Sequence, residues 1–92
     1  MDFERTDRDF IRWTSGGLSE DATANAELES DGDLHPLAVD DATGEITGYF
    51  AGPDAASPGA AVIVSGTSHI EIHIVDGSVT RTLDGGFIRL VP

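Results

Sequence analysis

The chain has 92 residues and a formal net charge of −12, because it contains 17 aspartates and glutamates but only five arginines and no lysine. It contains no cysteine, which excludes disulfides, zinc–thiolate sites and thiol nucleophiles. A chain of this length forms one domain, so we expect a single folded unit over residues 1–92.

The charge pattern also limits the partners. The few arginines are scattered along the chain and form no basic stretch of the kind that binds nucleic acid. No apolar run reaches the length of a membrane span, and the charged first residues differ from a signal peptide. We therefore expect no nucleic-acid partner, no membrane partner and a cytoplasmic location.

The excess of carboxylates predicts a protein adapted to concentrated salt. Mutual repulsion of like charges destabilises a compact state, and near molar salt the Debye length falls to about 3 Å, which screens most of that repulsion. The absence of lysine and the many alanines, glycines and threonines fit the same environment. In composition the chain resembles the cytoplasmic proteins of salt-accumulating haloarchaea.

The first segment is expected to form a short helix. Thr6 would cap it, with Asp9 closing a capping box. Its buried stripe would consist of Phe10, Ile11 and Trp13, and the helix would end at Gly16-Gly17.

Residues 22–29 fit two structures. Their residue types favour a helix, whereas the strict alternation of alanine and leucine with polar residues favours a strand. We favour the strand, because a turn at Asp31-Gly32 would place its apolar residues on the same face as those of the next strand. That register pairs Leu28 with His35, Ala26 with Leu37 and Ala24 with Val39, and a second turn over residues 40–44 adds Ile46, Gly48 and Phe50 to the face. Pro36 then requires a sheet edge or a bulge.

The second half predicts strands more clearly. After a loop over residues 51–59, residues 60–65 form a short apolar run typical of a strand covered on both faces. Residues 69–75 alternate, Asp76-Gly77 marks a hairpin, and return strands over 78–83 and 87–91 are separated by Gly85-Gly86. Arg81 falls on the apolar side, where it must reach a rim, an acid or a partner subunit.

These elements predict an α+β fold, in which the short N-terminal helix packs on an antiparallel β meander of six to seven strands. The alternative is a partial barrel. Closure into a barrel or association into a homodimer would protect the open edges of so short a sheet.

A polar face is the one constellation that suggests a site. His69, Glu71 and His73 occur at i, i+2 and i+4 of one strand, so their side chains leave the sheet on the same side. Neighbouring members lie about 7 Å apart along the strand, whereas the two histidines lie about 13 Å apart and cannot bind one ion together. This strand therefore supplies at most two ligands to a divalent transition metal such as zinc, nickel or iron, and His35 is the one remaining histidine.

The same face also predicts a ligand surface. The hairpin register would place Thr82 opposite Glu71 and Thr80 opposite His73, with Arg89 on the following strand. A third interpretation is a solvated sheet face without a site, since histidine and threonine are compatible with strands.

No catalytic residue is expected, because the chain has neither a nucleophile elbow nor a phosphate-binding loop. We expect a non-enzymatic module that self-associates as a homodimer or binds another protein, and that holds no cofactor. The alternative is a small metal- or ligand-binding β domain, catalytic or not, centred on Glu71 and His73.

Overall fold

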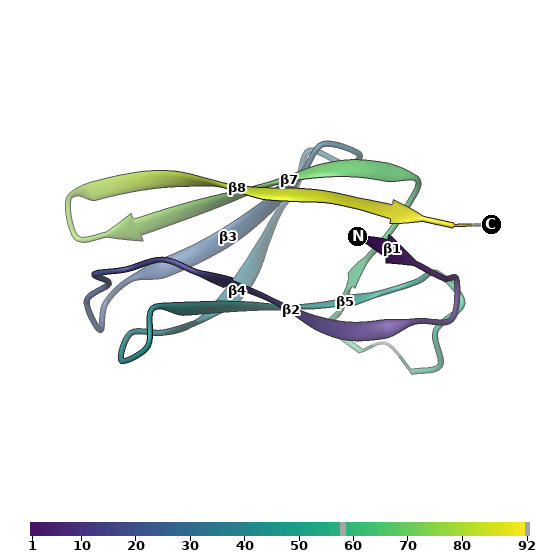
Figure 1. The fold of residues 1–92 in the computed structure, drawn as a ribbon, viewed down its shortest axis with the longest axis horizontal. Coiled ribbons are helices and arrows are strands. Elements are labelled where there is room, and N and C mark those ends of the chain that lie inside the picture. The colour runs from purple at the N-terminus through teal and green to yellow at the C-terminus, as the bar shows by residue number, and fades with distance from the viewer. Residues whose placement is uncertain (58, 92) are drawn as a thin grey trace.

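The computed structural model describes residues 1–57 and 59–91, and this part of the chain contains eight strands and no helix (Figure 1). The strands are β1 (Asp2–Phe3), β2 (Arg8–Thr14), β3 (Thr23–Leu28), β4 (Leu34–Asp40), β5 (Glu45–Ala51), β6 (Val62–Ile63), β7 (Thr67–Asp76) and β8 (Val79–Leu90). They form one sheet in the order β1-β8-β7-β3-β4-β5-β2, and β6 pairs with β5.

The sheet curls into a nearly closed, flattened barrel. One layer contains β3, β7 and β8, and the other contains β2 and β5 (Figure 1). Strand β4 joins them, because its first half pairs with β3 and its second half, from Ala38, pairs with β5. Pro36 lies in the first half, which does not pair with β5. The N–H that Pro36 lacks is therefore not needed for a hydrogen bond to β5.

The remaining gap lies between β2 and β8, and side chains span it. The indole Nε1–H of Trp13 donates to the carbonyl oxygen of Gly85 at 3.1 Å. Arg81 reaches the rim, where its guanidinium donates to the carbonyl oxygen of Gly16 at 3.1 Å. The charge of Arg81 is therefore at an exposed barrel end and not in the core.

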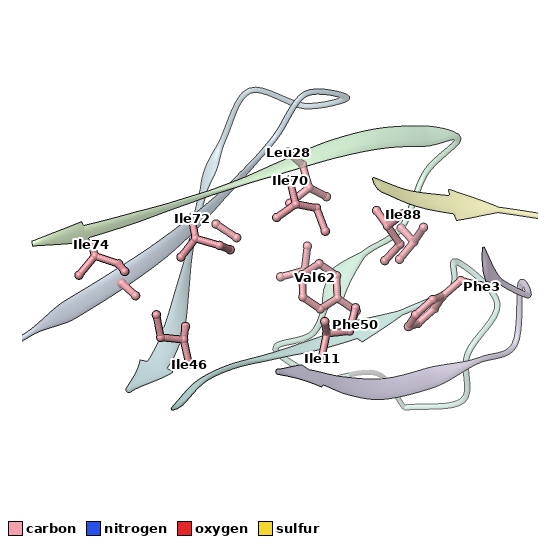
Figure 2. Close-up of a cluster of buried hydrophobic side chains, with 13 residues drawn as sticks. Phe3, Ile11, Leu28, Ile46, Phe50, Val62, Ile70, Ile72, Ile74 and Ile88 are labelled. Atoms are coloured by element: carbon pink, nitrogen blue, oxygen red, sulfur yellow. The ribbon is translucent and has the colours of Figure 1, made fainter. Parts of the chain in front are cut away.

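The core is the space between the two layers (Figure 2). It is filled by alternate residues of each strand, because successive side chains of a strand point to opposite faces. The cluster comprises Phe3, Ile11, Ala24, Ala26, Leu28, Ile46, Phe50, Val62, Val64, Ile70, Ile72, Ile74 and Ile88. The polar residues between them therefore form the two outer faces of the barrel.

The predicted N-terminal helix is wrong, and with it the α+β assignment. Residues Arg8–Thr14 form a strand that pairs with β5 along its whole length. Ile11 and Trp13 point inward while Phe10 points outward, which is a period of two and not the helical period. An isolated helix of about ten residues is marginal in water. Pairing with the seven-residue strand β5 instead gives every second residue of Arg8–Thr14 backbone hydrogen-bond partners. Aromatic and β-branched side chains also favour the strand.

The predicted all-antiparallel meander is also wrong, because β1–β8 and β5–β6 pair in parallel. Gly85-Gly86 does not separate two strands. It forms a bulge within the single strand β8, opposite Ile70 and Glu71. Gly86 has a φ of +83°, and a Cβ on Gly85 would lie 2.8 Å from Cγ2 of Ile70, so both positions require glycine. The apolar run over residues 60–65 contributes only the two residues of β6.

The strand over residues 23–28 is confirmed, but its register differs by two residues. Ala26 faces His35 and Ala24 faces Leu37, because the connecting loop is longer than two residues. In the β7–β8 hairpin the two-residue turn is at 77–78 and not at 76–77, which also changes the register by two residues. A slip of two leaves every side chain on its predicted face, which is why the apolar face is placed correctly.

Candidate functional site

The outer face of β3, β7 and β8 carries most of the predicted site residues, and we call it the acidic face. Its central residues are Glu27 of β3, Glu29 directly after β3, His69, Glu71 and His73 of β7, and Phe87 of β8. Four further residues of β8 point to the same side: Thr80, Thr82, Asp84 and Arg89. All of them alternate with buried residues of the same strands, so the packing of the core fixes their outward direction.

Three side chains of the acidic face converge. Glu27 lies directly opposite Glu71 in the β3–β7 ladder, and His73 is two residues further along β7. Nε2 of His73 lies 2.9 Å from Oε1 of Glu27 and 3.6 Å from Oε2 of Glu71. One ligand atom from each of the three lies within 4.8 Å of the others. These side chains are only partly exposed, at 35% for His73, 42% for Glu27 and 48% for Glu71.

Two directly opposed carboxylates destabilise a strand pair unless a positive charge lies between them. The imidazole of His73 lies within 3.6 Å of both carboxylates, and a divalent cation held by the three side chains would supply that positive charge. Two carboxylates and one imidazole suit zinc, nickel or iron, with water completing the coordination.

A depression of about 320 Å³ lies beside this cluster and is lined by Glu27, Glu29, His69 and Glu71. The His69 ring bonds to Oδ1 of Asp84 at 2.7 Å and packs against Phe87, with 4.9 Å between ring centroids. The N–H of Gly86, followed by the His69 ring, lowers the pKa of Asp84 below its ordinary value. The depression is thus acidic, and one of its lining residues, His69, contacts the exposed ring of Phe87.

The predicted site residues are distributed unevenly over the molecule. Thr82 lies opposite His73 and Asp84 opposite Glu71, whereas Thr80 lies opposite Val75, further from the cluster. Arg89 is opposite Thr67 at the other end of β7 and pairs with Asp2 at 3.2 Å.

His35 lies apart from the cluster. It faces Ala26 and shares the inward side of the sheet, where its ring bonds to Asp31 at 2.9 Å. The third side chain of the cluster is instead Glu27, which the sequence did not single out. Its outward direction follows from the alternation of residues 23–28, but its position beside Glu71 depends on the pairing of β3 with β7, strands that 38 residues separate.

A second outer face carries residues that the helix prediction concealed. We call it the arginine face: Arg8, Phe10 and Arg12 of β2 with Tyr49 of β5. Phe10 faces Tyr49, their ring centroids are 4.9 Å apart, and Phe10 is 53% exposed. Arg8 donates to the carbonyl oxygen of Ala56 at 2.8 Å, and Arg12 lies 3.5 Å from Glu45. The alternation of these residues with Ile11 and Trp13 was the available indication of a strand face.

Comparisons with known proteins return no match, whether with protein families, curated proteins or solved structures. No helix capable of crossing a membrane occurs in residues 1–57 and 59–91. The function therefore has to be inferred from the two outer faces.

Proposed function

We propose that the protein is a non-enzymatic interaction module that self-associates through the outer faces of its barrel. The observation that supports this is a large exposed aromatic ring on each face, Phe87 at 62% and Phe10 at 53% exposure. Aromatic residues and arginine are enriched in protein interfaces. Exposed apolar patches on small proteins commonly mark interaction sites.

Concentrated salt would favour this self-association. We place the protein in the cytoplasm of a salt-accumulating cell, where dissolved ions screen the carboxylates. Excluded salts strengthen the burial of apolar surface, so exposed rings associate more readily there than in dilute buffer.

Sedimentation equilibrium of the purified protein in molar potassium chloride tests the proposal. We expect a mass that rises above the 9.6 kDa of one chain as the protein concentration increases. Phe10→Ser and Phe87→Ser, which leave the core untouched, should each weaken the association. A mass of one chain at every concentration would reject self-association.

A divalent transition metal bound by Glu27, Glu71 and His73 is a second candidate function, favoured by the convergence of their ligand atoms within 4.8 Å. Titration calorimetry with zinc or nickel should give one ion per chain, and His73→Ala should abolish the binding. His35→Ala is the matched control, because it also removes an imidazole paired with a carboxylate, outside the cluster. Absence of stoichiometric binding, or equal effects of the two substitutions, would exclude this site.

A further inference from the structure

We infer that copies of this chain associate head to tail, with the arginine face of one copy seated on the acidic face of the next. This inference rests on the proposed self-association and names the surfaces that meet. It follows from the opposite charges of the two faces, from their aromatic rings and from their positions on the barrel.

The charges of the two faces are complementary. Arg8 and Arg12 hold two of the five positive charges of the chain, and they lie on one strand with Phe10 between them. The depression on the acidic face is lined by three glutamates and His69. A guanidinium binds a carboxylate through two parallel hydrogen bonds, so the depression is a suitable receptor for an arginine of a neighbouring copy.

Two acids lie on the same side of the sheet as the arginine face: Glu45 of β5 and, opposite it in the ladder, Asp40 of β4. Glu45 lies 3.5 Å from Arg12, but their side chains are 44% and 59% exposed. Exposed ion pairs of this kind contribute little to stability. Arg12 can therefore exchange Glu45 for a glutamate of the partner copy at small cost.

The aromatic rings are placed to meet. Phe87 packs against His69, which lines the acidic depression. Phe10 and Tyr49 stand beside the arginines on the other face. Seating one face on the other would bring these rings together and also cover the exposed side of Phe10 with apolar surface. Ring contacts strengthen in concentrated salt, which compensates for the screening of the ion pairs.

The positions of the faces decide the type of assembly. The acidic face is the outside of the layer that contains β3, β7 and β8, and the arginine face is the outside of the opposite layer (Figure 1). A two-fold dimer that paired the acidic face with itself would oppose like charges, which disfavours it. A head-to-tail contact between opposite sides leaves one unused face on each copy, so it grows into a ring or a chain.

Two complementary variants test this inference. Arg8→Glu/Arg12→Glu blocks the arginine face and keeps the acidic face, whereas Glu29→Gln/Glu71→Gln does the reverse. Asp33→Asn/Asp41→Asn is the matched control for the second variant, because it removes the same charge from two turns outside both faces. Mass is measured by sedimentation velocity in molar potassium chloride with a chelator present, and folding is checked by circular dichroism.

We expect each face variant to have an association constant reduced roughly tenfold or more, while the control associates as the wild type does. An equimolar mixture of the two face variants should form a one-to-one pair that stops at two chains, because only one competent contact remains. If either face variant is unfolded, Phe10→Ser and Phe87→Ser replace the two variants in the same mixing experiment.

The outcomes separate the two proposals. A wild type that stays monomeric rejects self-association itself. A wild type that associates while either face variant associates equally well rejects only the head-to-tail arrangement. Folded face variants whose mixture remains monomeric also reject it.

Discussion

Replacement of Trp13 by phenylalanine tests how the open side of the barrel is held together. In the structure the indole Nε1–H of Trp13 donates to Gly85 across the gap between β2 and β8, and the ring packs edge-on against Phe50 at a centroid distance of 6.1 Å. Phenylalanine keeps an aromatic ring against Phe50 but has no donor. Trp13→Phe therefore removes one neutral hydrogen bond and little packing.

A hydrogen bond of this kind contributes about 0.5–1.5 kcal/mol to the free energy of unfolding. We expect the lower half of that range for Trp13→Phe, because the carbonyl of Gly85 is at an open edge and can accept from water instead. In a domain of this size 1 kcal/mol corresponds to about 4–8 °C in Tm, so a decrease of about 4 °C is expected. Trp13→Ala also removes the ring from the core and should cost about 3 kcal/mol.

Thermal unfolding followed by circular dichroism in molar salt measures both variants, and the signal does not depend on the tryptophan that is removed. Hydrogen exchange of the amides in β8 gives a second observable, since the gap should open more often without the indole. An unchanged Tm for Trp13→Phe together with a loss below 1 kcal/mol for Trp13→Ala would refute this account of closure.

Three further predictions concern stability. Because screening offsets the repulsion of a −12 charge, the Tm should rise steeply from low to molar salt, and a flat salt response would contradict the halophilic interpretation. Gly85→Ala should lower the Tm strongly, because its Cβ would lie 2.8 Å from Cγ2 of Ile70, whereas Gly16→Ala, at a glycine without a positive φ, meets no atom within 4 Å; equal losses would contradict the role of the bulge. The lowered pKa of Asp84 means that its ionised form stabilises the folded state above pH about 4, and that this stabilisation disappears as the pH falls through the folded pKa. Asp84→Ala should therefore lower the Tm at neutral pH but not in acid, compared with Asp41→Ala, and a loss that persists in acid would contradict this cause.

The sequence was most informative where a strand is covered on one side only. The alternation in Thr23–Leu28 and Thr67–Asp76 predicts both the strands and the side that each buries. A strand with one buried face can slip by two residues without turning its apolar side chains to solvent, but not by one. It could not fix the register itself, since a longer loop or a two-residue turn displaced by one position changes the register by two and preserves the same pattern. The residue that faces Glu71 was therefore misidentified as Thr82 instead of Asp84.

The N-terminal segment shows where local propensity misleads. Thr6 and Asp9 resemble a helix cap, but the Asp7 carboxylate accepts from the N–H of Glu4 and closes a turn before the strand begins. The seven pairings with β5 that decide the structure come from residues more than 30 positions away. The helix prediction also hid the alternation of arginine and phenylalanine, and with it the arginine face.

The candidate cluster was predictable only in part. His73 and Glu71 follow from the alternation of a single strand, whereas Glu27 comes from β3, whose place beside β7 is a property of the whole barrel. From the sequence, His35 is a candidate ligand only because it is the one remaining histidine. The structure instead brings a carboxylate to the site and leaves that imidazole on the inward side of the sheet.

Small-angle X-ray scattering over a concentration series in molar potassium chloride tests self-association through the outer faces most directly. The Cα radius of gyration of a single chain is 13.2 Å. We predict that the measured radius increases with protein concentration, as copies stack through their outer faces. A radius that stays at the single-chain value at every concentration would contradict the account.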